Sequence, residues 1–153
     1  MRIFTNTAAI AVSAIALSVG TAFTVHADDS AAIKYRQAVM RAVGGHTGGA
    51  FAIMKGQVPY KDNLLAHAIG LDQMARILPS TFEQKTQGGE TRAKAEIWQD
   101  AAGFQEKIRE IQTAAAGFLA AVESGDQAAA REKLGSVGES CKGCHRKFRE
   151  KKP

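Results

Sequence analysis

The apolar side chains of this 153-residue chain recur at steps of three and four over four separate segments, which restricts the folds open to it. An apolar repeat near 3.5 residues is typical of the seam of a left-handed helix bundle. The stripes consist of Ile33, Met40, Ala50 or Phe51, and Met54; of Leu64, Ala68, Leu71, Ala75 and Leu78; of Phe104, Ile108, Ile111, Ala115, Phe118 and Val122; and of Ala130, Leu134, Val137, Cys141, Cys144 and Phe148. Beyond residue 27 no segment alternates with the period of two that indicates a strand. The pattern predicts an all-α fold, an antiparallel up-down-up-down four-helix bundle.

Residues that favour helix ends stand between these segments. Helix starts are expected at Ser30, Asp100 and Asp126, whose side-chain oxygens can accept hydrogen bonds from free backbone N–H groups. Helix ends are expected at Gly56 with Pro59, before Pro79, and at Ser124 with Gly125. The second helix is therefore expected from about residue 61 to residue 78, and residues 79–94 form one long loop. The other two connections are short, which favours antiparallel neighbours.

The first 27 residues have the features of a secretory signal. Arg2 supplies a positive start, residues 8–19 are apolar, and Val25 and Ala27 stand where a signal peptidase reads the chain. The apolar stretch is shorter than the about 20 residues of a membrane span. We expect a signal peptide over residues 1–27, a single four-helix-bundle domain over residues 28–153, and export to the periplasm. An uncleaved N-terminal anchor is the alternative.

The only two cysteines of the chain lie on the apolar stripe of the last predicted helix, in the motif Cys141-x-x-Cys144-His145. C-x-x-C-H is the attachment sequence of a c-type haem. Helix positions i, i+3 and i+4 share one side, so both thiols and the imidazole can reach one flat group. We expect one covalently bound haem c per chain, held by Cys141 and Cys144, with His145 as the proximal iron ligand.

Other uses of a C-x-x-C pair are less consistent with this chain. A structural zinc site needs four protein ligands, and only His46 and His67, on other predicted helices, could complete the set. A thioredoxin-like redox pair needs a βαβ context that is absent. A disulfide across so short a loop adds little stability. We expect His46 and His67 to be exposed or hydrogen-bonded rather than ligands.

Met40, on the inward stripe of the first helix, has two interpretations. It either fills the core or becomes the sixth iron ligand opposite His145, as in cytochromes with Met/His ligation. Arg36, one turn earlier, either holds a haem propionate through charge-assisted hydrogen bonds or lies on a solvated face. Glycine in a helix costs about 1 kcal/mol relative to alanine, so a close approach of the haem or of a facing helix is expected at Gly44, Gly45, Gly48 and Gly49.

Together these features resemble the class II c-type cytochromes, which comprise cytochrome c′ and its low-spin relative cytochrome c-556. The resemblance spans essentially the whole chain after residue 27. It rests on the C-terminal Cys-Lys-Gly-Cys-His with Lys-Phe-Arg after it, on Tyr35-Arg36-Gln37 with Met40, on Lys55-Gly56, and on Glu96-Ile97-Trp98. The C-terminal place of the haem motif is the specific part, because class I cytochromes c carry it near the N-terminus.

The resemblance implies roles for particular residues. Cys141 and Cys144 would carry the thioethers, and His145 would be the axial ligand. Arg36 and Gln37 would lie near a propionate.

Two further positions leave the type of cytochrome open. Met40 matches the distal position, where cytochromes c′ have a non-ligating apolar residue and cytochromes c-556 have a methionine ligand. Arg146 departs from the family pattern, since an acidic residue frequently follows the ligand histidine, and this concerns the reduction potential rather than haem attachment. Many cytochromes c′ dimerise through their first two helices, which makes a homodimer possible.

The leading functional hypothesis is a periplasmic carrier of one electron, with redox proteins as partners and no enzymatic turnover. The alternative is a five-coordinate haem protein that binds NO or CO, and a structural zinc bundle is the third hypothesis. The net charge of +5 does not indicate nucleic-acid binding, because a nucleic-acid-binding surface needs a clustered basic face. No membrane association is expected once the signal is removed.

A basic run close to the C-terminus consists of Arg146, Lys147, Arg149, Lys151 and Lys152. Such a run suits the negative C-terminal end of a helix dipole, and it could also dock an acidic redox partner. Positive charge at Lys147 and Arg149, close to the proximal ligand, is expected to raise the reduction potential.

Overall fold

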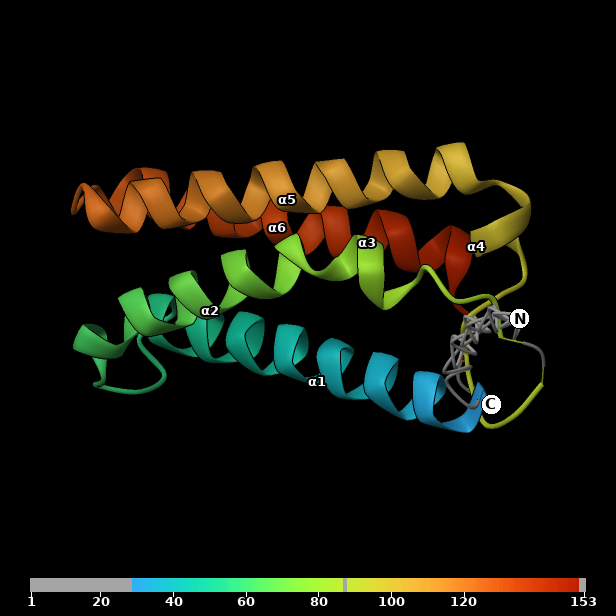
Figure 1. The fold of residues 1–153 in the computed structure, drawn as a ribbon. Helices are drawn as coiled ribbons and strands as arrows, with labels where there is room; N and C mark the ends of the chain where they lie inside the picture. The colour runs from blue at the N-terminus through green and yellow to red at the C-terminus, as the bar shows by residue number, and fades with distance from the viewer. Residues whose placement is uncertain (1–28, 87, 152–153) are drawn as a thin grey trace, which may run out of the picture.

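Four long helices dominate the computed structural model, which describes residues 29–86 and 88–151 (Figure 1). They are α1 (Asp29–Met54), α2 (Leu64–Arg76), α5 (Ala101–Glu123) and α6 (Gln127–Phe148), and three short helical segments are η1 (Lys61–Asn63), α3 (Leu78–Thr81) and α4 (Glu96–Gln99). Figure 1 shows that α1 and α5 run in one direction while α2 and α6 run back. The predicted antiparallel four-helix bundle is confirmed. The predicted signal peptide, residues 1–27, lies outside the described residues.

The apolar stripes form the core of the bundle. Its largest fully buried side chains are Phe118, Leu71, Leu134 and Val137. They come from three of the four long helices and belong to the predicted stripes, so the 3.5-residue repeat identified the inward faces correctly. None of the described helices is long and apolar enough to span a membrane.

The predicted boundaries of α5 and α6 at Asp100, Gly125 and Asp126 are confirmed, and the predicted start of α1 is wrong. Asp100 accepts a hydrogen bond from the backbone N–H of Gly103, and Asp126 accepts two, from residues 128 and 129. Gly125, just beyond α5, has a φ of 74°, which glycine adopts without strain. Ser30 is not the N-cap of α1, because the helix already includes Asp29.

The second helix was expected to stop before Pro79, and it does, but Pro79 does not open the long loop as expected. The helix α2 ends at Arg76, and the next helical segment, α3, contains Pro79 in its first turn. Proline is tolerated there because the first N–H groups of a helix have no partner within it. The long loop therefore begins after α3.

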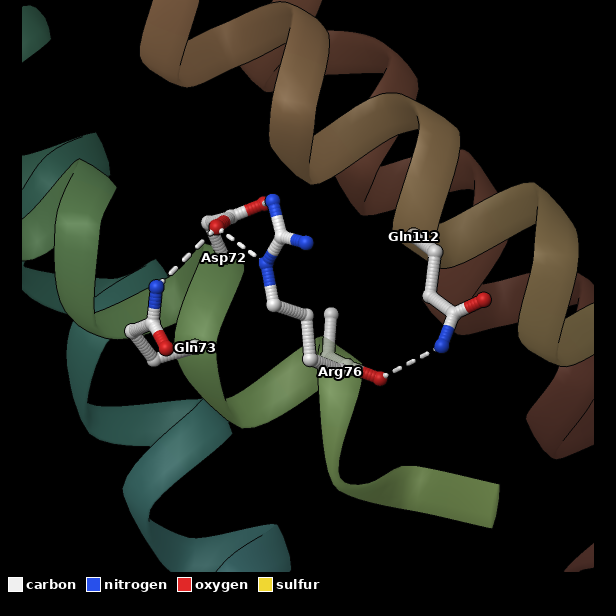
Figure 2. A network of polar contacts seen from close by, with 5 residues as sticks. Asp72, Gln73, Arg76 and Gln112 are labelled. Atoms are coloured by element: carbon white, nitrogen blue, oxygen red, sulfur yellow. Dashed lines mark hydrogen bonds and ion pairs between the residues drawn. The ribbon is translucent and has the colours of Figure 1, made fainter.

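A network of polar contacts joins α2 to α5 (Figure 2). The carboxylate of Asp72, only 3% exposed, accepts a hydrogen bond from Arg76 Nε at 2.8 Å within α2. The side chain of Gln112 on α5 donates to the backbone carbonyl of Ala75 at 3.2 Å. The buried side chain of Asp72 thus has an ion-pair partner, the guanidinium of Arg76, on its own helix.

The long loop returns to the end of α6 and is held there as a strap, residues 92–94. The N–H of Lys94 donates to the carbonyl of Phe148 at 3.1 Å, and the N–H of Glu150 donates to the carbonyl of Arg92 at 2.8 Å. Arg92 Nε also donates to the carbonyl of Glu150, at 3.0 Å. The strap therefore closes one side of the bundle beside the Cys-x-x-Cys-His motif.

Candidate functional site

A cavity opens between α1, α5, the end of α6 and the strap. It holds about 760 Å³ of space outside the protein atoms, its open mouth included. Its apolar lining consists of Met40, Leu78, Phe82, Ala93, Ile97, Phe104, Ile108, Ile111 and Phe148. Its polar lining consists of Arg36, Gln37, Thr91, Arg92, Lys107, Cys144, His145 and Arg149. The structure thus brings five of the six predicted site residues to one cavity.

The sixth predicted residue, Cys141, lies one turn before Cys144 on α6 and packs against the core. Both thiols are free and partly buried. Burial raises the pKa of Cys141, and burial together with the neighbouring thiol of Cys141 raises the pKa of Cys144 to about 11. Both sulfurs are therefore neutral thiols at pH 7 and line one side of α6.

His145 faces the same cavity. Burial lowers its pKa, and the positive charges of Arg149 and Arg92 lower it further. The imidazole is consequently neutral at pH 7, which is the form that ligates a metal ion.

Arg36 does not lie on a solvated face, because it is only 3% exposed. Its Nη1 donates to Thr86 Oγ1 at 3.2 Å and its Nη2 to the carbonyl of Gln84 at 3.1 Å. The guanidinium lies over the rings of Phe82 and Trp98, with its central carbon 5.1 and 5.2 Å from their centroids. Burial is the main cause that lowers its pKa, and Asp29 opposes it.

The third guanidinium nitrogen of Arg36 differs from the two that donate hydrogen bonds. Arg36 Nε is buried and has no hydrogen-bond partner among the described residues. The neighbouring Gln37 donates from Nε2 to the carbonyl of Glu90 at 2.7 Å. These two residues and Met40 line the α1 side of the cavity, across from His145 on α6.

The predicted close approach at the α1 glycines involves a facing helix at one position. A Cβ added to Gly49 would lie 2.4 Å from Cε1 of His67 on α2, whereas Gly44, Gly45 and Gly48 face open space. None of these four glycines lines the cavity.

Among the described histidines, His46 and His67 are not exposed as expected. His46 and His67 are half-buried, and the Nδ1 atom of each is buried without a partner among the described residues. They do not line the cavity, and no three His, Cys, Asp or Glu side chains of the described residues gather where a metal ion could be held. The zinc bundle therefore finds no support in this part of the chain.

Sequence reasoning missed Arg92 and Lys107 as cavity residues. Arg92 lies in a loop without periodicity and reaches the site only through contacts with residue 150. Lys107 is paired with Glu110 on α5. In the sequence, the spacing of these two residues is that of an ordinary ion pair on a helix surface.

The cavity fits a haem. Its walls are largely apolar, and positive charge at Arg36, Arg92 and Arg149 suits a ligand with acidic substituents. The orphaned Arg36 Nε is a buried donor that such a substituent would satisfy. Two thiols and a neutral imidazole on α6 complete the set of groups that attach and ligate a c-type haem.

Comparisons with known proteins agree with this fit. The family model described as Cytochrome C′ matches residues 31–149. A cytochrome c′ of Alcaligenes xylosoxydans xylosoxydans is 36% identical over 122 residues, which cover 79% of this chain and 94% of that protein. A cytochrome c-556 of Agrobacterium tumefaciens (strain B2A) is 31% identical over 121 residues, 78% of this chain and 98% of that protein.

Solved structures lead to the same family. The crystal structure of cytochrome c′ from Rubrivivax gelatinosus superposes with a TM-score of 0.74 at 31% identity, covering 80% of this chain and 97% of the other. A nitric oxide complex of a cytochrome c′ mutant from Alcaligenes xylosoxidans superposes with a TM-score of 0.75 at 35% identity, covering 83% and 99%. Fold, cavity, motif and comparisons agree, and the chain belongs to the cytochrome c′ family of proteins that bind haem c covalently.

Proposed function

We propose that this protein is exported to the periplasm and there carries one electron on its haem c, without turning over a substrate. Cys141 and Cys144 are the thioether anchors, and His145 is the proximal ligand. The observation that carries the proposal is the position of this motif, half-buried on α6 beside an open cavity. A cofactor held there would lie beside the open side of the cavity, where a redox protein would dock.

The residues around the cavity have defined tasks in this proposal. The bound haem supplies the redox-active iron. The neutral imidazole of His145 offers a lone pair to the metal, and Arg36 Nε offers a buried hydrogen-bond donor to a propionate. The apolar wall formed by Phe104, Ile108 and Ile111 would keep water from a haem bound in the cavity.

A second candidate function is the binding of nitric oxide or carbon monoxide. It is favoured by the solved relatives, among which are a nitric oxide complex and a carbon monoxide complex of cytochrome c′ variants. Met40 lines the α1 side of the cavity. A methionine that only packs there would leave an axial position of the iron open to a small gas.

Absorption spectra of the purified holoprotein distinguish these candidates. They are recorded oxidised, reduced, and reduced under carbon monoxide. Sharp reduced bands that carbon monoxide leaves unchanged support a six-coordinate electron carrier. A broad high-spin spectrum that changes with carbon monoxide supports gas binding. A colourless protein from a host competent in cytochrome maturation would contradict both.

The bundle also has a surface suited to a second copy of the chain. Exposed apolar side chains stand on α2 at Leu65 and Ile69, which are 41% and 44% exposed. Because Gly45 and Gly48 on α1 face open space, another helix can come close there. We propose a homodimer through α1 and α2.

Light scattering tests this proposal. It should give the dimer mass for the wild type and the monomer mass for Ile69→Glu, and a monomeric wild type would refute the proposal.

A further inference from the structure

We propose that Arg92, the first residue of the strap beside the end of α6, raises the reduction potential of this protein through its positive charge near His145. Arg92 is thus a positioning residue that acts on the iron ligand without ligating the metal. The inference rests on the proposed electron-carrier function and adds a residue outside the haem motif that adjusts it.

The side chain of Arg92 is fixed by several bonds to one residue. Its Nε and Nη2 atoms both donate to the backbone carbonyl of Glu150, and the N–H of Glu150 donates back to the carbonyl of Arg92 at 2.8 Å. The N–H of Arg149 in turn donates to the carbonyl of His145 at 3.2 Å. The guanidinium is therefore anchored to the chain segment that directly continues the turn of His145.

The charge of Arg92 is not paired with a carboxylate of the described residues. Within the described ranges neither Arg92 nor Arg149 forms an ion pair, whereas Lys107 is paired with Glu110 and Lys147 with Asp100. Arg92, Arg149 and His145 all line the cavity. Arg92 is exposed, so salt screens its charge beyond a Debye length of about 8–10 Å. Its effect therefore rests on its place in the lining of the same cavity as His145.

The sign of the effect follows from the electron count. Uptake of one electron from a redox partner turns ferric iron into ferrous iron and lowers the positive charge of the site by one. A fixed positive charge nearby disfavours the ferric form and therefore raises the reduction potential.

Redox titrations of the holoprotein test the inference. Arg92→Gln and Arg92→Met remove the charge, Arg92→Lys retains it, and all three keep the backbone bonds of the strap. The matched control is Arg131→Gln, an exposed charge loss on α6 that lies 14 residues before His145, or about 21 Å along the helix.

The neutral variants should shift the midpoint potential downward with an unchanged absorption spectrum, while Arg92→Lys stays near the wild type and Arg131→Gln does not move. Either neutral variant suffices if the other does not fold. An unshifted neutral variant, or a lysine variant that shifts as far as the neutral ones, would overturn the role of the charge. A wild type that shows no reversible one-electron titration would instead refute the proposed electron carrier.

Discussion

His46 and His67 pack edge to face between α1 and α2, with ring centroids 5.6 Å apart and ring planes at 70°. Each ring lies against a glycine of the opposite helix, His46 against Gly70 and His67 against Gly49. A Cβ at either glycine would come within 2.4 Å of the facing ring. The two helices therefore reach their spacing because each supplies a glycine where the other supplies a histidine.

Gly49→Ala should destabilise the protein through crowding against His67. Overpacking costs typically about 1–3 kcal/mol, and the better helix propensity of alanine returns about 1 kcal/mol. The expected net loss in the free energy of unfolding is up to about 2 kcal/mol, measured by urea denaturation of the holoprotein.

The control for this crowding is Gly135→Ala on α6, where an added Cβ meets nothing within 4 Å. That variant should gain up to about 1 kcal/mol. If the loss in Gly49→Ala comes from the ring, combining it with His67→Ala should restore part of the stability relative to additivity. Strict additivity of the two changes would show that the ring and the glycine do not interact.

Asp100→Ala should lower stability in a way that depends on pH. The carboxylate caps α5 through the N–H of Gly103 and accepts a hydrogen bond from Lys147 at the end of α6. Lys147, followed by the Gly103 N–H, lowers the pKa of Asp100. A carboxylate whose pKa is depressed on folding stabilises the protein fully above its unfolded pKa of about 3.9, and this contribution disappears as the pH falls through the folded value.

The difference in stability between wild type and Asp100→Ala should therefore be constant from pH 7 to pH 5 and shrink below about pH 4. Urea denaturation at several pH values measures it. Lys147→Met removes the main cause of the pKa shift. The difference in stability between Lys147→Met and Asp100→Ala should therefore depend less on pH than the difference between wild type and Asp100→Ala. A gap between wild type and Asp100→Ala that widens in acid would contradict the assignment.

Replacing Cys141 and Cys144 together by alanine should give a protein without covalent haem. Each thiol supplies one thioether bond, so either single variant should retain one bond and remain coloured after denaturing electrophoresis. Haem staining and intact mass measure the attachment. Ser136→Ala, an exposed change on the same helix, should leave it unaffected. Covalent haem in the double variant would place the attachment site elsewhere.

The parts of the fold that depend on local sequence were predictable. The 3.5-residue repeat marked the inward faces, and the side chains of Asp100 and Asp126 cap helices within three residues of themselves. The haem motif is equally local, because its three groups lie within five residues. Pro79 was misjudged since a proline that ends one helix and a proline that begins the next have the same local appearance.

The surroundings of the site depend on contacts between distant residues and were not predictable. Arg36 was expected at the cavity, but its partner Thr86 is 50 residues away and lies in a loop without periodicity. The contact between Arg92 and Glu150 spans 58 residues. No spacing rule relates such pairs, because they form only once the helices have packed and the loop has returned to α6.

Met40→Ala separates the two functional candidates at a single residue. Under the electron-carrier proposal Met40 ligates the iron, and its removal should convert a sharp low-spin spectrum into a broad high-spin one that responds to carbon monoxide. Met54→Ala, a buried methionine on the same helix outside the cavity, should lower stability by about 2–5 kcal/mol and leave the spectrum unchanged. A Met40→Ala spectrum identical to that of the wild type would mean that Met40 only packs, and the open iron position would then favour the gas-binding candidate.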